Sequence, residues 1–191
     1  MDRSAIAARH PHPRFDARPA IHLAQAQPGE IAELQSLATG AMQTFKATTP
    51  PEPFAGVEIV DAAGQPRPIT GWQGRVVLLN LWATWCAPCL KELPALDRLK
   101  TELGGADFDV VALNIDKAPE KPRKFLADNA IKALEFLRDP TTKAFAAVKS
   151  QGMPTTLLLD RQGREIGRLV GPAEWDSPEA KALMQAAIAV K

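Results

Sequence analysis

A pair of cysteines stands between a buried-strand pattern and a helical pattern. Residues 76–82 form a continuous apolar run, Val-Val-Leu-Leu-Asn-Leu-Trp, which is typical of a strand covered on both faces. The motif Cys86-Ala87-Pro88-Cys89 follows three residues later. Beyond it, leucines at 93, 96, 99 and 103 recur at helical spacing, and two glycines end the pattern. The sequence therefore predicts a strand, a turn that carries both cysteines, and a helix.

These two cysteines are the only ones in the 191-residue chain, so no framework of structural disulfides exists. At the start of a helix, free N–H groups and the helix dipole favour an anion, and we expect Cys86 to be the attacking thiolate. Cys89, nearly one turn later, is expected to be more buried and to resolve the mixed disulfide that Cys86 forms. Pro88 fits the first turn, where a missing N–H is not needed.

Two other interpretations of the cysteine pair are a chance spacing and half of a zinc site. Zinc prefers four ligands, but no third cysteine exists and the histidines, His10, His12 and His22, all lie near the N-terminus. We therefore expect no metal and no cofactor other than the disulfide itself. Ala87 offers neither charge nor a hydrogen bond to stabilise a thiolate, which favours a reductase over an oxidase.

Three further residues near the motif or before a later strand are candidates for a role. Glu92 lies on the same helical face as Cys89, and its carboxylate could accept the proton that Cys89 must lose. Alternatively, Glu92 is a solvated residue that pairs with Lys91 or a nearby charge, and spacing alone favours neither. Pro94 is expected to kink the helix. Pro154 would mark a functional turn if its peptide bond were cis, although X–Pro bonds are trans by default.

The chain divides into three stretches. Residues 1–27 hold arginines and prolines without an apolar period, which predicts a disordered tail. The pattern of residues 28–49 predicts a helix that runs to about residue 46 and is followed by a linker. Residues 50–191 are expected to form the main domain. No run approaches the roughly 20 apolar residues of a membrane span, and the first 27 residues lack a secretory apolar core. We therefore expect neither an anchor nor a signal peptide in this chain. The net charge of +1, with both signs interspersed, does not favour a nucleic-acid partner.

Strand and helix patterns alternate through the main domain, which predicts an α/β fold with a mixed central sheet flanked by helices on both faces. We expect an N-terminal β-hairpin at the sheet edge, from residues 57–60 and 65–69. The other predicted strands are 76–82, 108–115, 134–137, 155–159 and 164–170, and the predicted helices are 86–103, 120–129, 141–148 and 178–190.

Several stretches resemble a known family. Residues 82–89, Trp-Ala-Thr-Trp-Cys-Ala-Pro-Cys, resemble the active-site strand and turn of the thioredoxin superfamily. With residues 91–94, 111–116 and 152–156 they resemble the TlpA/ResA group of bacterial thiol:disulfide interchange proteins. Glu120-Lys121-Pro122 and the stretch 171–175 are similar to the alphaproteobacterial TlpA branch. The resemblance covers the chain from about residue 54 onward.

This resemblance implies a thioredoxin-like fold with an inserted βα element at roughly residues 107–138. It implies that Pro154 is cis and faces the disulfide, and that Met153 and Trp85 contact the protein substrate. Asn80 stands where thioredoxins carry a buried aspartate that accepts a proton. Glu92, which this group carries, is therefore implied as the proton acceptor here.

The resemblance also implies a place in the cell and a set of partners. The group is usually tethered to the cytoplasmic membrane and faces the periplasm, and a cytoplasmic thioredoxin-like reductase is the alternative. The implied substrates are proteins with oxidised cysteines in cytochrome c maturation or in copper-site assembly of cytochrome oxidase. A membrane thiol reductase is the implied electron donor.

Two rival families share this architecture and fit less well. Thiol peroxidases resemble a Pro-x-x-x-Thr-x-x-Cys pattern, but Leu79 stands at the proline position, seven residues before Cys86. Copper chaperones of the Sco kind resemble Cys-x-x-x-Cys with a distant histidine. This chain has one residue fewer between its cysteines and no histidine in the domain.

Overall fold

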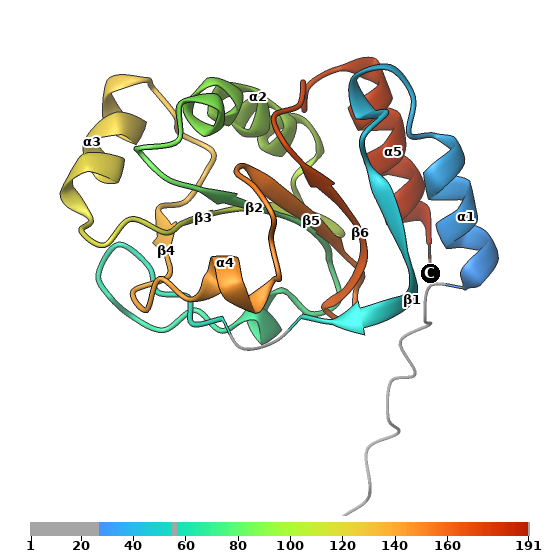
Figure 1. Ribbon diagram of the computed structural model, residues 1–191, viewed down its shortest axis with the longest axis horizontal. Coiled ribbons are helices and arrows are strands. Elements are labelled where there is room, and N and C mark those ends of the chain that lie inside the picture. Colours follow the sequence, from blue (N-terminus) through green and yellow to red (C-terminus); the bar gives the residue numbers. More distant parts are fainter. Residues whose placement is uncertain (1–26, 55–56, 191) are drawn as a thin grey trace, which may run out of the picture.

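The apolar run at residues 76–82 forms the centre of the sheet. In the computed structural model, which describes residues 27–54 and 57–190, β2 (Val76–Trp82) pairs in parallel with β3 (Phe108–Asn114) and antiparallel with β5 (Thr155–Leu159). Every residue of β2 and β5 is buried, as expected for strands covered on both faces. The sheet has six strands in the order β1-β6-β5-β2-β3-β4 (Figure 1). Its outer strands are β1 (Lys46–Pro53), β6 (Arg164–Val170) and β4 (Leu137–Arg138).

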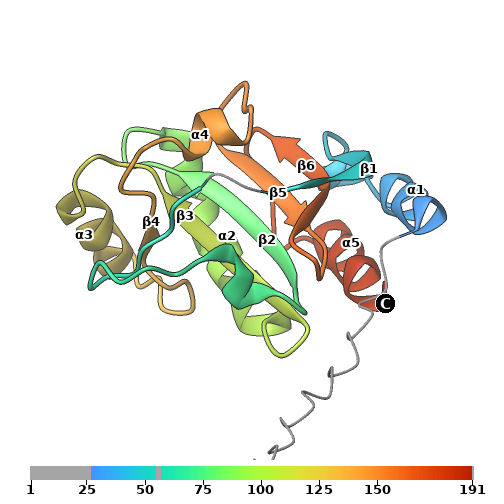
Figure 2. The same ribbon diagram turned by 90° about the horizontal axis from the view of Figure 1, so that it is seen from below.

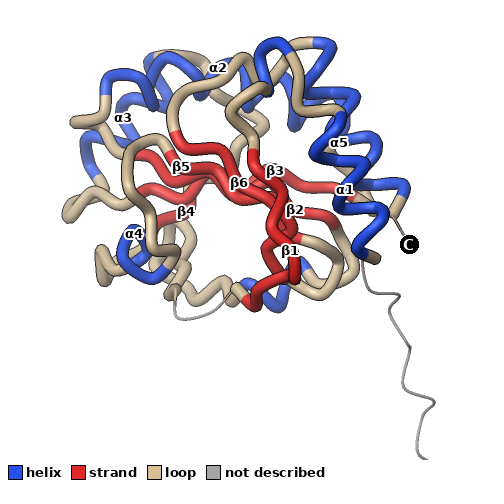
Figure 3. Tube along the Cα trace, turned by 45° about the vertical axis from the view of Figure 1, so that its right-hand side comes forward, coloured by secondary structure: helices blue, strands red, loops and turns tan. Residues whose placement is uncertain are grey.

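Helices cover both faces of this sheet, as predicted. One face carries α2 (Ala87–Leu103), α3 (Glu120–Asp128) and α5 (Pro178–Ala189), and the short α4 (Ala144–Ala147) lies on the other (Figures 2 and 3). The connections β2-α2-β3 and β3-α3-β4 each join parallel strands, and such crossovers are almost always right-handed. This handedness places α2 and α3 on the same face of the sheet. α1 (Pro28–Ser36) lies beside α5 near the β1 edge (Figure 1).

Most predicted elements are found, and among the predicted helices the N-terminal one differs most in length. α1 ends at Ser36 and is followed by a separate 3-10 turn, Gly40–Met42, instead of running to residue 46. Gly40 has a φ of 51°, in the region that glycine adopts most easily and that a regular helix does not use. Met42 and Phe45 are nevertheless buried in the core. Their apolar spacing reflects burial rather than one continuous helix.

The predicted N-terminal β-hairpin is much shorter than expected. Residues 57–60 and 65–69 form no strand, and only an isolated antiparallel bridge joins Val60 to Pro66. Val60 also bridges Arg138, with both backbone hydrogen bonds formed, at 2.9 and 3.0 Å. Two backbone hydrogen bonds flank this bridge, from the N–H of Arg67 to the carbonyl of Ile59 at 2.7 Å and from the N–H of Asp61 to the carbonyl of Gln65 at 2.9 Å. The segment is therefore a short bridged turn that pairs with β4 through Val60, rather than two full strands.

The segment predicted as a linker contains a strand. β1 crosses the predicted boundary at residue 50 and pairs antiparallel with β6, with an irregularity in register between Ala47 and Glu52. Its three prolines are tolerated because β1 is an edge strand. Just before it, Phe45 packs over Gly167 of β6, where an added Cβ would overlap the aromatic ring. The N-terminal segment thus shares one core with the sheet.

The predicted inserted element contains β3, α3 and β4, and one carboxylate ties it to α2. Oδ1 of Asp97, in α2, accepts the backbone N–H groups of three successive residues after α3, Lys132, Ala133 and Leu134, at 3.1, 2.7 and 2.9 Å. Phe125 of α3 lies with its ring centroid 6.1 Å from that of Trp82. The insert and the cysteine-bearing helix are therefore fixed to each other.

The predicted disordered tail, residues 1–27, lies outside the described residues except for Gln27, as do all three histidines. Within residues 27–54 and 57–190, no helix has both the length and the apolar character that crossing a bilayer requires.

Candidate functional site

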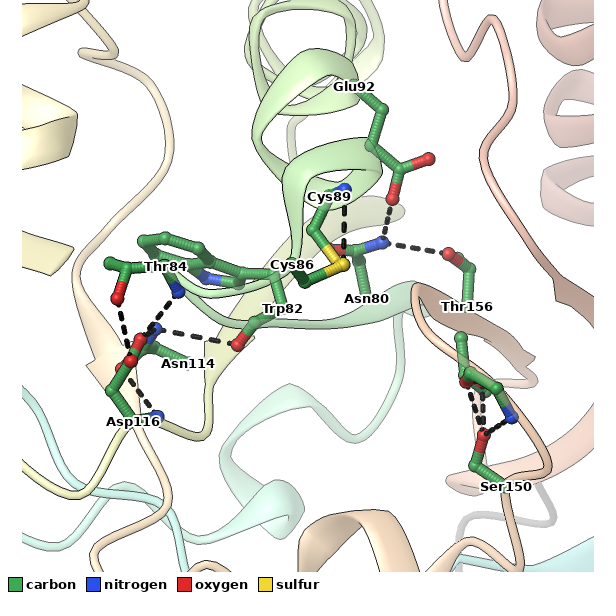
Figure 4. The surroundings of a disulfide bond; sticks show 12 residues. Asn80, Trp82, Thr84, Cys86, Cys89, Glu92, Asn114, Asp116, Ser150 and Thr156 are labelled. Carbon is green, nitrogen blue, oxygen red and sulfur yellow. Dashed lines mark hydrogen bonds between the residues drawn. A yellow bond between two sulfur atoms is a disulfide. The ribbon is translucent and has the colours of Figure 1, made fainter.

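Cys86 and Cys89 form a disulfide at the N-terminus of α2 (Figure 4), with their Cα atoms 5.3 Å apart. Cys86 is the N-cap residue, and its Sγ accepts the backbone N–H of Cys89 at 3.3 Å. Cys89 is fully buried, whereas Cys86 retains 5% exposure. Pro88 lies in the first turn, as predicted. The geometry thus leaves Cys86 as the outer sulfur and Cys89 as the inner one.

The loop that leads into the motif is held by a buried carboxylate that sequence reasoning missed. Asp116, just after β3, accepts the backbone N–H and the hydroxyl of Thr84, both at 2.8 Å. Asn114 donates to the same carboxylate at 2.7 Å (Figure 4). Asp116 belongs to a stretch that carries the family resemblance, but a contact across 32 residues leaves no local pattern. This network fixes the backbone immediately before Trp85 and Cys86.

Glu92 is buried, so the interpretation of a solvated surface residue is wrong. Its side chain retains 4% exposure and accepts three hydrogen bonds. Asn80 Nδ2 donates to Oε1 at 2.8 Å. The backbone N–H of Ala173 and the indole Nε1 of Trp175 donate to Oε2 at 3.1 and 3.0 Å. These donors come from β2 and from the loop between β6 and α5.

Burial changes the protonation of this carboxyl group. Desolvation raises the pKa of Glu92 from 4.5 to about 7, and the hydrogen bonds from Ala173, Asn80 and Trp175 lower it in part. A carboxyl group with such a pKa exchanges a proton near neutral pH, which is the range in which a general acid or base is most effective.

Asn80 connects Glu92 to the sheet. Its amide nitrogen donates both to Glu92 and to the hydroxyl of Thr156, in β5, at 2.9 Å. Among the described residues, its Oδ1 is one of two buried side-chain polar atoms without a hydrogen-bond partner. Figure 4 shows Asn80 between the disulfide and Thr156. The residue at the position of the thioredoxin aspartate is therefore a donor to Glu92.

Met153 and Pro154 precede β5 at the same end of the sheet as the motif. The peptide bond between them is cis, as the resemblance implies. Because Leu81 of β2 pairs with Thr155, the preceding residue, Pro154, lies beside the C-terminal end of β2. Its carbonyl accepts the N–H of Gly171 at 2.9 Å. Contact between Pro154 and the disulfide stays a prediction.

A groove lies beside the motif. It has a volume of about 940 Å³, and Trp85 and Met153 line it together with Phe145 and residues of the insert. Trp85 is 66% exposed, which is unusual for a large apolar side chain. The full lining is Trp85, Ile115, Asp116, Lys117, Ala118, Glu120, Lys121, Thr142, Phe145 and Met153.

A second hollow, of about 670 Å³, opens on Glu92. Its other lining residues are Pro88 and Lys91 of α2, Pro172, Ala173 and Glu174 of the loop after β6, and Ala41. The two hollows have no lining residue in common.

Within the described ranges, no group of three or more His, Cys, Asp or Glu side chains is placed to hold a metal ion. Pro94 lies inside α2, which continues to Leu103.

Comparisons with known proteins agree with this geometry. The Redoxin family model matches residues 40–184. The thiol:disulfide interchange protein HelX of Rhodobacter capsulatus is 30% identical over 143 residues, which cover 71% of this chain and 79% of the relative. The thiol-disulfide oxidoreductase ResA of Bacillus cereus is 26% identical over 113 residues, which cover 59% of this chain and 65% of ResA, just under two thirds of its length.

A solved structure shows the same architecture. A Chlorobium tepidum protein, described as a candidate thiol:disulfide interchange protein DsbE, superposes with a TM-score of 0.65 at 27% identity, covering 72% of this chain and 96% of that one. The resemblance found in the sequence is confirmed. From its fold, its cysteine pair and these matches, the chain belongs to the Redoxin family and has the thioredoxin-like fold of the thiol-disulfide oxidoreductases.

Proposed function

We propose that this protein is a protein-disulfide reductase that works through Cys86 and Cys89. The observation that carries the proposal is the closed disulfide at the start of α2 with the buried carboxylate of Glu92 on the same helix. The direction of transfer rests on Ala87, which supplies no charge to the outer sulfur and so leaves the dithiol form without extra stabilisation.

The first step uses the reduced protein. The thiolate of Cys86 attacks one sulfur of a disulfide in the substrate protein and forms a mixed disulfide. The other substrate sulfur leaves as a thiolate and takes a proton from water. The N–H of Cys89, which lies 3.3 Å from Sγ of Cys86, favours the thiolate before the attack.

The second step releases the substrate. The thiol of Cys89 gives its proton to Glu92, and the resulting thiolate attacks Sγ of Cys86. The second substrate sulfur leaves as a thiolate, the Cys86–Cys89 disulfide is restored, and two electrons have passed to the substrate. A pKa of about 7 leaves Glu92 roughly half ionised at neutral pH and so able to accept this proton.

The groove supports the assignment of substrate contacts to Trp85, Met153 and Pro154. An exposed indole beside a reactive disulfide offers apolar surface to an incoming polypeptide. The backbone before β5 is the second candidate surface, since the cis bond at Met153–Pro154 lies at the same end of the sheet. Pro88, Asn80 and Pro94 are proposed as structural residues around the site.

The family resemblance supports a role in cytochrome c maturation or in copper-site assembly of cytochrome oxidase. We place the protein in the periplasm with a membrane anchor in its native form, and a membrane thiol reductase supplies its electrons. A general cytoplasmic reductase is the alternative.

Trapping tests the proposal. Cys89→Ser keeps the attacking sulfur but removes the resolving one, so it should accumulate mixed disulfides with native substrates, identified by mass spectrometry. Cys86→Ser is the matched control and should trap none. Recovery of haem- or copper-assembly proteins with paired cysteines supports the pathway, whereas a broad cytoplasmic set supports the alternative. A reduction potential near −120 mV, the value of a strong oxidant, would contradict the reductase assignment.

A further inference from the structure

The loop between β6 and α5 contacts the candidate proton acceptor, although it lies far from the cysteines in sequence. Trp175, in this loop, is 1% exposed and reaches Glu92 across 83 residues of chain. Ala173 adds a backbone N–H from the same loop. The loop begins at Gly171, whose N–H donates to Pro154, and it is also tied to α2 by an ion pair of 2.6 Å between Asp176 and Arg98.

The two oxygens of Glu92 have different surroundings. A carboxylate oxygen has two lone pairs, so the two donors from the loop fill Oε2. Oε1 accepts one hydrogen bond, from Asn80, and keeps one lone pair open. Figure 4 shows that the oxygen bonded to Asn80 lies on the side of the disulfide, whereas the other oxygen points away from it.

We propose that Trp175 is a positioning residue: with the N–H of Ala173, its indole N–H occupies Oε2 of Glu92 and leaves Oε1, on the side of the disulfide, as the atom that receives the proton of Cys89. This inference rests on the proposed role of Glu92 and extends it to a residue that touches neither sulfur. The indole also stabilises the ionised carboxylate, since a hydrogen bond to a charged acceptor favours the charged form.

The test replaces the indole with a ring that has no N–H group. Trp175→Phe keeps most of the buried ring and removes the donor. We expect the pKa of Glu92 to rise by about one unit, because a hydrogen bond to a charged group is lost. At pH 7 the ionised fraction would fall from about one half to about one tenth, and release of substrate from the mixed disulfide would slow about fivefold.

Two measurements report the effect. The pKa of Glu92 is read in the oxidised protein from the ¹³C shift of its labelled carboxyl group, independently of activity. The pH profile of substrate release is read by rapid mixing with a model disulfide peptide. Ala173→Pro, which deletes the other N–H to Oε2, is the second variant and should shift both midpoints in the same direction.

Trp72→Phe is the matched control. Trp72 is also buried and also donates its indole N–H to a carboxylate, Asp109, at 2.9 Å, but it lies before β2, at the far end of that strand from the motif. Its replacement should leave the pKa of Glu92 and the release profile unchanged. An equal shift in Trp72→Phe would show a general effect of losing an indole and would overturn the inference.

A double variant separates the inference from the proposed function. In a Glu92→Gln background, Trp175→Phe should no longer move the release profile, and a shift of the same size there would overturn the inference. An unchanged pKa of Glu92 in both Trp175→Phe and Ala173→Pro would also overturn the inference about Trp175. If the pH profile of substrate release nevertheless changes in Glu92→Gln, the role of Glu92 as proton acceptor still holds. A wild-type profile in Glu92→Gln itself would refute that role instead.

Discussion

Nδ2 of Asn80 donates to Oε1 of Glu92 across 2.8 Å, and both side chains are buried. One residue lies in the central strand and the other in the helix that carries the cysteines. Because Asn80 is neutral, it can hold the carboxylate without adding like charge. This pairing leads to the first prediction.

Asn80→Asp should raise the pKa of the carboxyl pair above about 7. Two carboxylates at this separation disfavour each other's ionised form, so one proton is shared until higher pH. Carboxyl titration by NMR would measure the shift. Asn129→Asp, at the exposed end of α3, adds the same charge far from the site and should leave the titration of Glu92 unchanged. A titration of Asn80→Asp that matches wild type would contradict the prediction.

Glu92→Gln should flatten the pH dependence of stability. Because burial raises the folded-state pKa of Glu92 from 4.5 to about 7, the folded protein binds this proton more tightly than the unfolded chain does. The contribution to stability is therefore fully present below pH 4.5 and is lost as the pH rises through 7. The shift of about 2.5 units corresponds to about 3 kcal/mol. Urea unfolding between pH 4 and 8 measures this slope.

The control for this experiment is Glu174→Gln. Glu174 is exposed and lines the same hollow as Glu92, so its replacement should leave the decline in stability between pH 4.5 and 7 intact. A Glu92→Gln variant that still loses about 3 kcal/mol over this range would show that another group causes the decline.

Asp116→Ala should loosen the loop that leads to the disulfide. The change leaves the N–H of Thr84 without its acceptor and removes the shorter of the two hydrogen bonds that the amide of Asn114 donates, so we expect a loss of about 2–3 kcal/mol in unfolding free energy. Hydrogen exchange at the amide of Thr84 should accelerate. Asp128→Ala removes an exposed ion pair with Lys124 and should change stability by less than about 0.5 kcal/mol. Unaltered protection of Thr84 would count against the anchoring role.

Gly167→Ala should destabilise the protein by about 2 kcal/mol, because the new methyl group overlaps the ring of Phe45. Thermal or urea unfolding measures the loss, and adding Phe45→Leu should recover part of it. Gly71→Ala, where nothing lies within 4 Å of the new Cβ, is the control. An additive double variant would mean that Phe45 does not pack over β6 in solution.

The sequence predicts best what depends on neighbours in the chain. β2, β5 and β6 have the predicted bounds, because runs of apolar residues and an intervening turn are local signals. β1 was missed because its prolines argue against a strand, and only pairing with β6 at the sheet edge makes one possible. The predicted hairpin is limited to one bridge between Val60 and Pro66, and Val60 also pairs with Arg138, a contact across 78 residues that no local pattern indicates.

The candidate site shows the same division. The cysteines and Glu92 follow from spacing on one helix, and spacing left the burial of Glu92 open. Trp175 could not be found in this way, because its contact with Glu92 spans 83 residues and has no period. The stretch 171–175 carried the family resemblance, which was the one signal in the sequence that pointed to this loop.

The separation of the two hollows has a consequence for turnover. A polypeptide that contacts only the groove around Trp85 would leave uncovered the residues that line the hollow beside Glu92. With Glu92 as the proton acceptor that we propose, the carboxylate could then pass its proton to water through that hollow before the complex dissociates. Regeneration of the acceptor and departure of the product are then independent events, and neither has to wait for the other.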